Sequence, residues 1–439
     1  MRPSVAVVVG GILLVGLLAP VSAVPAASAL ADGNVCRGTI TAPANGTTVI
    51  SVQGARFQPN VTKEQARLVA VGPYGGIKWI HRSAKSEGIV WSYDIDPLPN
   101  GNLFVTATRP QRTVLYELDT ETLEKRWEVV LPFVDTHDAD MLDRHRIAIA
   151  NMRNPDPEND TNNDRVVIYN RTSDTIEWEW RFAPRYPRSV GGNFSEDWTH
   201  VNDVDRIGDG RYLLSPRNFD QVIVVDRDTG TIDLKLGADD DFSILRKQHN
   251  PQYLESNDGA PTILVADSDN DRIVEYERDN DGWERTWELG GPEVFDWPRD
   301  ADRLPNGNTL IADSRNHRVL EVTPDGKVVW ELYTPWLVYD VERLPLGDEP
   351  GGPTIVDQEA SGTYPLSAAT PWPHERITRC GNYLDSVTPT TDRTPTLGPT
   401  TGRTTTQPAT ASPGQSGFGI ALGVAVVLLV VLGLQRRYL

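Results

Sequence analysis

The sequence predicts an all-β fold, a six-bladed β-propeller, and three observations support this prediction: a repeated motif, strand-like periodicity and complementary ends. The motif, here called the anchor motif, recurs six times at spacings of 44, 65, 47, 50 and 40 residues. These spacings suit a four-stranded blade, with one insertion. No stretch of the repeated region has a competing helical periodicity. The six copies are YDIDPL (from residue 93), HDADML (137), NDVDRI (202), HNPQYL (249), RDADRL (299) and YDVERL (339).

The remaining strands of each blade are predicted from three columns of runs that follow the anchor motifs. Each run has β-branched and aromatic residues at period two, and turn pairs such as Asn-Gly, Thr-Gly and Asp-Gly separate several of them. RIAIANM and NTLIADS represent the first column, RVVIYNR and RVLEVTP the second, and IEWEWRF and KVVWELY the third. We therefore assign residues 32–386 to one propeller.

The last blade is expected to close the ring with strands from both ends of the domain. After TIVD (354–357) the sixth unit has no outer strands, but RLVAVGPYGGIKWIH (67–81) aligns with residues 318–332, including the turn. The N-terminal segment then completes the blade and removes exposed strand edges. Cys36 and Cys380 flank this closure, and we expect them to lie close enough for a disulfide.

Both ends of the chain have the patterns of membrane-directed segments. Residues 1–31 contain an apolar run after Arg2 and end in Ala-Leu-Ala, as a secretory signal peptide does; an uncleaved N-terminal membrane anchor is the alternative. A Thr- and Pro-rich stalk (387–416) precedes a predicted transmembrane helix (417–434). The arginines of the tail (435–439) predict a cytoplasmic location for it, so the propeller is expected on the extracellular side of the cell membrane.

The charge of the chain limits its partners. The net charge is -19, with seven lysines and 35 arginines. Such a field repels phosphate-rich molecules, so we expect no nucleic acid partner. Acidity with so few lysines also suits a surface hydrated in high salt, as in a halophile.

The first residue of each anchor motif is a candidate site residue. Innermost strands of a propeller converge on a central channel, so these residues are expected to form a ring around its mouth. His200, two residues before Asn202, lies near the same ring. Large polar side chains that converge in a concavity are typical of a binding or catalytic site. The ring consists of Tyr93, His137, Asn202, His249, Arg299 and Tyr339.

Three segments carry a resemblance to a known family: HDADML, DWTHVNDVDRIGDGRYLLSPRNFDQVIVVD (197–226) and QHNPQYL (248–254). They resemble the arylsulfotransferase family, whose members are exported six-bladed propellers that move sulfuryl groups between phenols without a nucleotide donor. The resemblance implies that His249 is the nucleophile that becomes sulfated. It also implies that His137, His200 and Arg217 hold the sulfuryl oxygens and assist proton transfer.

The resemblance further implies an aryl sulfate donor, a phenolic acceptor and no cofactor. We expect the remaining ring residues, Tyr93, Asn202, Arg299 and Tyr339, to contact the substrate. The chemistry needs such residues, because charge spreads over three equatorial oxygens during transfer and positioned cations stabilise it. A neutral imidazole can attack sulfur and divide the transfer into two steps. Arg217 offers planar, always-charged donors, and a further histidine can carry the proton.

Two alternatives compete with this hypothesis. A non-catalytic surface propeller with NHL-like strands could bind glycans or proteins, and its polar side chains would then point to different faces. A quinone-dependent propeller dehydrogenase is less favoured, because no repeated tryptophan docking motif is found.

Other polar features have simpler interpretations. His317 is expected to be structural, and His81, His145 and His374 lie outside the ring. Three acidic runs could hold calcium but lack a complete loop pattern, so we interpret them as solvated surface and predict no metal site. These runs are 156–164, 238–241 and 267–272.

Overall fold

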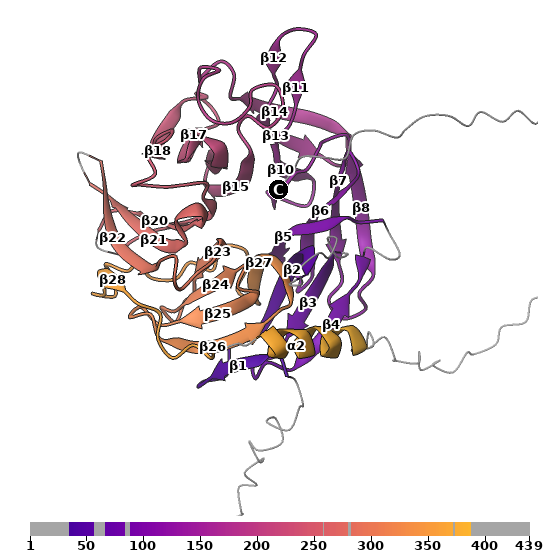
Figure 1. Cartoon of the computed structure of the whole chain (residues 1–439). Coiled ribbons are helices and arrows are strands. Elements are labelled where there is room, and N and C mark those ends of the chain that lie inside the picture. Colours follow the sequence, from indigo (N-terminus) through magenta and orange to yellow (C-terminus); the bar gives the residue numbers. More distant parts are fainter. Residues whose placement is uncertain are drawn as a thin grey trace, which may run out of the picture. The chain divides into compact units, whose positions relative to one another are not determined.

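The computed structural model describes residues 35–56, 66–83, 88–257, 259–279, 282–371 and 374–387. Within this part of the chain, six sheets, each built on four antiparallel strands, stand around a common channel, which confirms the predicted all-β six-bladed propeller (Figure 1). No helix in these ranges is long and apolar enough to cross a membrane. The predicted signal segment, the transmembrane helix and the tail, together with nearly all of the stalk, lie outside the described residues.

Five blades follow the chain from the channel outwards, each starting with its anchor motif. Blade 1 contains β5 (Trp91–Pro97), β6 (Leu103–Arg109), β7 (Arg112–Leu118) and β8 (Lys125–Leu131). Blade 2 contains β9 (Ala139–Met141), β10 (Arg146–Asn151), β13 (Arg165–Asn170) and β14 (Thr175–Arg181). Blade 3 contains β15 (Val201–Gly208), β16 (Arg211–Pro216), β17 (Gln221–Asp226) and β18 (Ile232–Gly237). Blade 4 contains β19 (His249–Leu254), β20 (Thr262–Asp267), β21 (Arg272–Arg278) and β22 (Trp283–Gly290), and blade 5 contains β23 (Pro298–Arg303), β24 (Thr309–Asp313), β25 (Arg318–Val322) and β26 (Val328–Tyr333).

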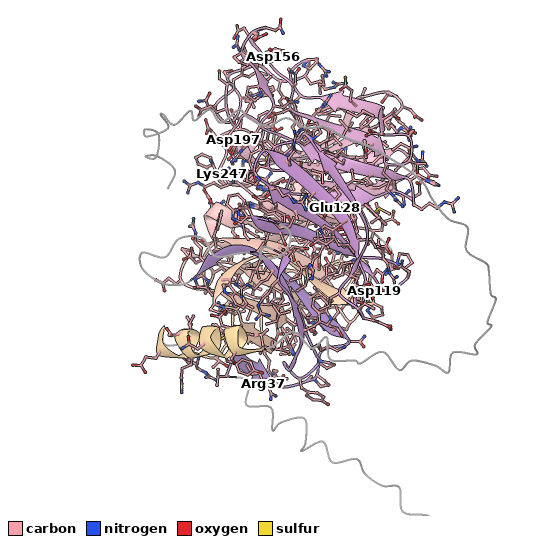
Figure 2. The ribbon with its side chains drawn as sticks, turned by 90° about the vertical axis from the view of Figure 1, so that its right-hand side faces the viewer. Arg37, Asp119, Glu128, Asp156, Asp197 and Lys247 are labelled. Carbon is pink, nitrogen blue, oxygen red and sulfur yellow. A yellow bond between two sulfur atoms is a disulfide. The ribbon has the colours of Figure 1, made fainter. Side chains whose placement is uncertain are left out.

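The long spacing between the second and third anchor motifs is explained by an insertion in blade 2. A small hairpin, β11 (Pro155–Asp156) and β12 (Thr161–Asn162), leaves the blade between β10 and β13. Figures 1 and 2 place this hairpin, which carries Asp156, and the C-terminal helix on opposite sides of the ring of blades. The insertion therefore adds a projection without disturbing the four-stranded sheet.

Adjacent blades share apolar cores, because the middle strands of each blade are buried on both faces. One such core, between blades 2 and 3, contains Trp180, Trp198, Tyr212 and Phe219. In three blades a tryptophan of the fourth strand also makes a contact with the next blade. Its indole N–H donates to a backbone carbonyl in an outer turn of the next blade: Trp180 to Gly230 (3.0 Å), Trp287 to Pro324 (2.9 Å) and Trp330 to Pro73 (3.0 Å).

Blade 6 closes the ring with one C-terminal and three N-terminal strands, in the order β27 (Trp336–Leu344), β2 (Thr47–Arg56), β3 (Arg67–Val71) and β4 (Ile77–His81). The outer strands within 67–81 are as predicted. The second strand is not: residues 354–357 form a turn, and β2 takes their place beside β27, with Val49 opposite Glu342. The backbone N–H of Ile355 donates to buried Glu275 at 2.8 Å, which holds the turn away from the sheet.

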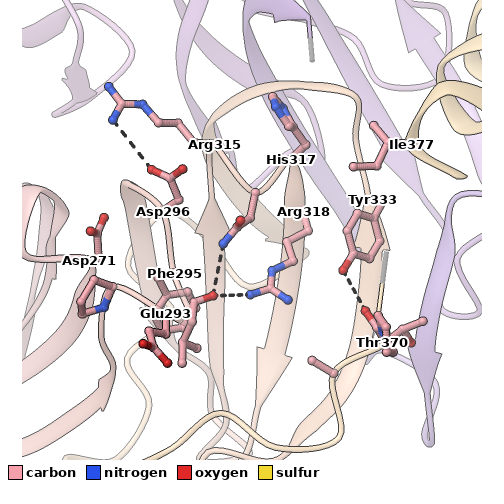
Figure 3. A pocket seen from close by; sticks show the side chains of 15 residues that line it. Asp271, Glu293, Phe295, Asp296, Arg315, His317, Arg318, Tyr333, Thr370 and Ile377 are labelled. Atoms are coloured by element: carbon pink, nitrogen blue, oxygen red, sulfur yellow. Dashed lines mark hydrogen bonds and ion pairs between the residues drawn. The ribbon is translucent and has the colours of Figure 1, made fainter. Parts of the chain in front are cut away.

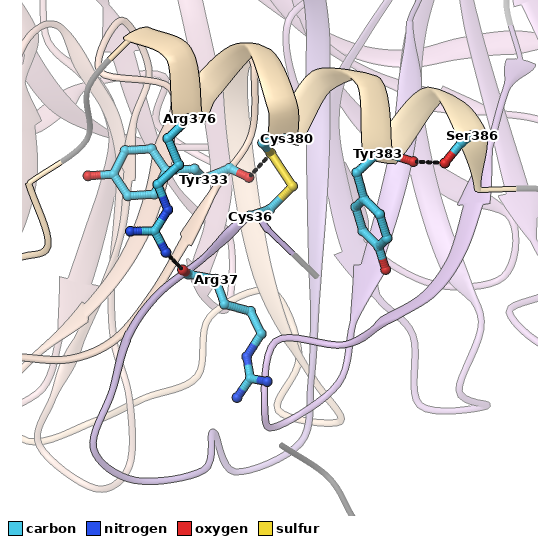
Figure 4. The surroundings of a disulfide bond; sticks show 7 residues. All are labelled: Cys36, Arg37, Tyr333, Arg376, Cys380, Tyr383 and Ser386. Carbon is cyan, nitrogen blue, oxygen red and sulfur yellow. Dashed lines mark hydrogen bonds between the residues drawn. A yellow bond between two sulfur atoms is a disulfide. The ribbon is translucent and has the colours of Figure 1, made fainter. Parts of the chain in front are cut away.

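A disulfide joins Cys36 to Cys380 across a sequence separation of 344 residues (Figure 4). Cys380 lies on α2 (His374–Ser386), and Cys36 immediately precedes β1 (Arg37–Ile40), which pairs with β26. Strand β28 (Gly362–Tyr364) similarly covers the outer edge of β22. Ile377 and Leu384 of α2 pack into the core beside the disulfide, so both ends of the domain are fixed to the closing region.

Replacing both cysteines by serine is expected to lower the free energy of unfolding by about 2–5 kcal/mol, the usual effect of losing a native disulfide. The measurement is denaturant unfolding of the double variant and of the parent chain, each with and without reductant. An unfolding midpoint that is the same for all four samples would contradict the stabilising role.

Candidate functional site

Aromatic and imidazole rings from five blades contact one another at one end of the channel. His137 stacks on Tyr93, with ring centroids 4.0 Å apart, and meets the ring of His200 edge-on at 4.9 Å. The ring centroid of Tyr339 lies 5.4 Å from that of His137 and 6.1 Å from that of His249. Residues that are far apart in the sequence are therefore brought together in one place.

A repeated turn positions these side chains. The residue two positions before the anchor motif has a positive φ in blades 2 to 5: Asp135, His200, Lys247 and Trp297. An aspartate of the preceding blade accepts the backbone N–H of this residue in two cases, from Lys247 to Asp220 (2.9 Å) and from Trp297 to Asp271 (2.8 Å). In blade 3 the turn residue is itself a histidine, at φ 44°, which explains why His200 joins the site from outside its anchor motif.

Each of the first two histidines has an aspartate partner. His200 Nδ1 lies 2.8 Å from Asp197 Oδ2, and its Nε2 is buried with no hydrogen bond among the described residues. His137 Nε2 lies 3.7 Å from Asp135 Oδ2, and its Nδ1 is likewise buried without a partner. Arg153 forms ion pairs with both aspartates and so connects the two pairs. An aspartate therefore orients one ring nitrogen of His200 by a hydrogen bond and lies near one ring nitrogen of His137, while the other nitrogen of each ring has no partner among the described residues.

The contacts of His249 determine its tautomer. Its Nδ1 lies 2.8 Å from the hydroxyl oxygen of Ser268, and that hydroxyl donates to the carbonyl of Ala266 at 3.3 Å. The tautomer that satisfies both contacts is the one in which the Ser268 hydroxyl donates to Ala266 and His249 Nδ1–H donates to Ser268. The lone pair of neutral His249 is therefore on Nε2, which forms no hydrogen bond in the described part of the chain.

Two arginines accompany the histidines. Arg217 starts a 3₁₀ turn after β16, its backbone N–H donates to the carbonyl of His200 (3.3 Å), and its guanidinium donates to Asn218 Oδ1 (3.0 Å). Arg299 is buried over the Trp297 ring, 3.6 Å from its centroid, and donates to Gln53. Its Nε has no partner among the described residues.

Burial and the arginines keep the imidazoles neutral. Burial lowers the pKa of His137 to about 4, against the opposing effect of Asp135. Burial and then Arg217 lower the pKa of His200 well below its usual value, and burial, Arg299 and Arg217 do the same for His249. Burial also lowers the pKa of Arg299 to about 9. The site thus combines neutral nitrogen bases with guanidinium cations, a combination suited to an anion that is attacked by a nucleophile.

The other predicted ring residues form the wall of the site. The Tyr93 hydroxyl donates to Asp135 at 2.6 Å, and that of Tyr339 to the carbonyl of Asn202 at 3.4 Å. Burial raises the pKa of both tyrosines well above 10, so they remain neutral. The Asn202 side chain donates to the carbonyl of Gln248 (3.0 Å), directly before His249, while its Oδ1 is buried without a partner in the described structure.

The polar residues that support the site carry little signal in the sequence. Two aspartates are recognisable in part, because Asp135 lies two positions before His137 (VDTH) and Asp197 lies three positions before His200 (EDWTH). Arg153 has no such signal. Despite their burial, the pKa of both aspartates is lowered by the neighbouring histidine and Arg153. Ser268 and Gln53 carry no distinguishing signal in the sequence.

His317 lies elsewhere, in a surface pocket of about 720 Å³ on blade 5 (Figure 3). Its Nδ1 contacts the carbonyl of Trp336 at 2.9 Å, a structural contact. The pocket arginines have partners: Arg315 pairs with Asp296, and Arg318 donates to the carbonyl of Val294.

The acidic runs that were considered for calcium make structural contacts. Asp160 pairs with Arg188, Asp267 with Arg272, and Asp239 accepts the backbone N–H of Gly191. Of the histidines outside the ring, His145 contacts Thr172 at 2.7 Å, His81 ends β4 and His374 begins α2.

The family model described as "Arylsulfotransferase (ASST)" matches residues 47–286. No curated protein sequence is significantly similar to the chain. Similar solved structures include a protein of unknown function from Bacteroides caccae (12% identity, 68% of this chain and 98% of that chain covered, TM-score 0.46) and a protein from Lactobacillus plantarum (14%, 68% and 99%, 0.41). Virginiamycin B lyase from Staphylococcus aureus is also similar (10%, 54% and 69%, 0.34). TM-scores this low carry no argument about function.

Proposed function

Because the chain belongs to the arylsulfotransferase family, we propose that it transfers a sulfuryl group from an aryl sulfate ester to a phenol through a sulfated His249. The family match covers blades 1 to 3, most of blade 4 and the three N-terminal strands of blade 6, and it includes His137, His200, Arg217 and His249. In the first step, the lone pair on His249 Nε2 forms an N–S bond as the S–O bond to the aryl group breaks, and the electron pair leaves on the phenolate oxygen.

We assign the proton transfer to His200. Its Nδ1 is held by Asp197, so Nε2 is the atom that exchanges a proton, and the charge of a bound sulfate ester favours its protonated form. The imidazolium gives its proton to the departing phenolate. In the second step it takes a proton from the incoming phenol, whose oxygen attacks sulfur while the S–N bond breaks and its electron pair returns to His249.

The two arginines and His137 are proposed to hold the sulfuryl oxygens. Arg217 and Arg299 are the cations that most affect the pKa of His249, and neither guanidinium is paired with a carboxylate among the described residues. They can therefore neutralise an anion as charge spreads over its equatorial oxygens.

The observation that carries this proposal is the meeting of three histidines, each with one ring nitrogen that has no hydrogen-bond partner among the described residues. A purely binding propeller would not require neutral bases beside guanidinium groups that have no carboxylate partner among the described residues. The test is incubation of the purified chain with a chromogenic aryl sulfate and a phenol. The proposal predicts released phenol and a sulfated acceptor, and the absence of both across a panel of donors would contradict it.

Ser268→Ala is expected to lower the rate of the first step roughly ten- to a hundredfold, because His249 loses the contact that orients its ring and fixes its tautomer. The measurement is a single-turnover burst of phenol release. Ser314→Ala is the matched control: Ser314 occupies the same Ala-Asp-Ser position one blade later, and within the described ranges its hydroxyl bonds only to the carbonyl of Val338. Equal losses in the two variants would indicate a folding effect.

The rate of the first step should change less than about twofold between pH 7.5 and 5.5 with a donor whose leaving group needs no proton. The lowered pKa of His249 keeps it neutral as pH falls, whereas an ordinary histidine pKa near 6.5 would cost about tenfold at pH 5.5. Circular dichroism at each pH monitors folding. A tenfold loss in a folded sample would contradict the assigned neutral nucleophile.

We also propose that the propeller acts outside the cell and is held at the membrane. Support comes from the disulfide, which suits an oxidising compartment, and from the apolar segments 5–18 and 417–434. Protease accessibility on intact cells, with N-terminal sequencing of the mature chain, tests this proposal.

A further inference from the structure

Further along the same inner strands, the channel holds a second cluster made of carboxylates. Ten of them line a cavity of about 20 Å³. They are the second residue of five anchor motifs, the fourth residue of three, and Asp348 and Glu349 of the segment that follows β27. We call this set the carboxylate cluster.

The carboxylate cluster has no protein cation to balance it. Among the described residues, none of the ten carboxylates forms an ion pair with arginine, lysine or histidine. Four of these residues also have a buried carboxylate oxygen with no hydrogen-bond partner, and because each residue is at most 7% exposed, bulk water does not solvate that oxygen. An ionised carboxylate in that state costs several kcal/mol unless a proton or a cation compensates it. These four are Asp94, Asp203, Asp302 and Glu342.

A structural role explains only part of the cluster. One oxygen of Asp300 accepts the backbone N–H of Val341 (3.0 Å), and one of Asp340 accepts that of Ile95 (2.9 Å). These bonds join neighbouring inner strands and account for aspartate at the second anchor position. These backbone bonds do not account for the unpartnered oxygens of the four residues named above, all of which line the same cavity.

We propose that the carboxylate cluster binds Ca²⁺, with Asp205 and Asp348 among its ligands. Oxygens of Asp138, Asp203 and Asp205 lie within 4.8 Å of one another, as do those of Asp205, Asp348 and Glu349. Oxygens on opposite sides of one Ca²⁺ are separated by about 4.6–5.2 Å, given Ca–O distances of about 2.3–2.6 Å. Each triplet can therefore share an ion.

The donor set selects the type of cation. All ligands are carboxylate or amide oxygens, which hard cations prefer, and the cluster contains no imidazole or thiolate for zinc or copper. Mg²⁺ usually keeps several water molecules, and a cavity of about 20 Å³ has room for roughly one. Ca²⁺, which accepts six to eight oxygen ligands in a flexible geometry, suits this cavity better.

Binding would connect parts of the propeller that are distant in sequence. Asp205 belongs to β15 of blade 3, whereas Asp348 belongs to the segment after β27. An ion shared by their side chains ties this segment to the inner strands. The proposal concerns stability and does not depend on sulfuryl transfer.

The test is to measure bound metal and thermal unfolding of the purified chain. We expect elemental analysis to find Ca²⁺, and Ca²⁺ at about a hundred times its Kd to raise Tm by roughly 5 °C relative to chelator-treated protein. Mg²⁺ should raise it less. A metal-free sample whose Tm is the same with Ca²⁺ and with chelator would overturn the proposal, because protons alone would then neutralise the cluster.

Variants separate this site from adventitious binding. Asp203→Asn and Asp348→Asn should each reduce the Ca²⁺-dependent rise in Tm by at least half, and measuring both guards against one failing to fold. Asp313→Asn is the control, since Asp313 is equally buried but pairs with Arg318 at 2.7 Å. It should lower Tm equally with and without Ca²⁺. A full Ca²⁺-dependent rise in both cluster variants would place the ion elsewhere and contradict the assignment.

Discussion

His249→Ala is expected to lower kcat for aryl sulfate turnover on the order of 10⁴-fold, the scale of losing a covalent nucleophile. The residue is 1% exposed, its Nδ1 is fixed by Ser268, and its Nε2 is the unpartnered atom that the proposed mechanism uses. Truncation to alanine removes the atom that forms the N–S bond. The measurement is steady-state phenol release from a chromogenic donor.

His317→Ala is the matched control for this substitution. His317 is also buried, its pKa is lowered by burial to about 4, and its Nδ1 contacts the carbonyl of Trp336. We expect this variant to lose stability but to keep kcat within about twofold when folded. Added imidazole should partly restore activity to His249→Ala only. Wild-type kcat in the His249 variant would eliminate the covalent mechanism.

Arg217→Lys is expected to lower kcat roughly ten- to a thousandfold with little effect on folding. Lysine keeps the positive charge but loses the planar pair of donors that can contact two equatorial oxygens. Arg217 is suited to that contact because, among the described residues, its guanidinium is bonded only to Asn218, its neighbour in the chain. The measurement is kcat and KM for one donor, with Tm recorded for each protein.

The control for this prediction must lie outside the histidine site. Arg299 is unsuitable because it is buried among the same side chains and affects the pKa of His249. Arg315 is better: it lies over the same Trp297 ring, at 4.3 Å, but pairs with Asp296 at the surface. Arg315→Lys should be nearly neutral. If Arg217→Lys were equally neutral, the proposed contact with the sulfuryl oxygens would be wrong.

The repeated part of the fold was predictable because its signals are local. Anchor motifs and period-two runs identify the inner strands and most others, and the likeness of residues 67–81 to 318–332 identifies the closing strands. The second strand of blade 6 was not predictable, because a four-residue apolar run such as 354–357 can equally be a strand or a buried turn. Its turn depends on Glu275, a residue about 80 positions away.

The candidate site was predictable to a similar degree. The first positions of the anchor motifs identify ring residues, but the partners Asp135, Asp197, Arg153 and Ser268 are defined by contacts that only the folded chain makes. The carboxylate cluster was missed for another reason. Aspartates are usually exposed, so the second anchor position was not recognised as facing a closed channel.

The most direct test of the account is mass spectrometry of the chain after incubation with an aryl sulfate in the absence of an acceptor. We predict a mass gain of one SO₃ group on the peptide that contains His249, and its loss when a phenol is added. Turnover without any modified enzyme, or sulfation at another residue with His249 unmodified, would contradict the proposed intermediate.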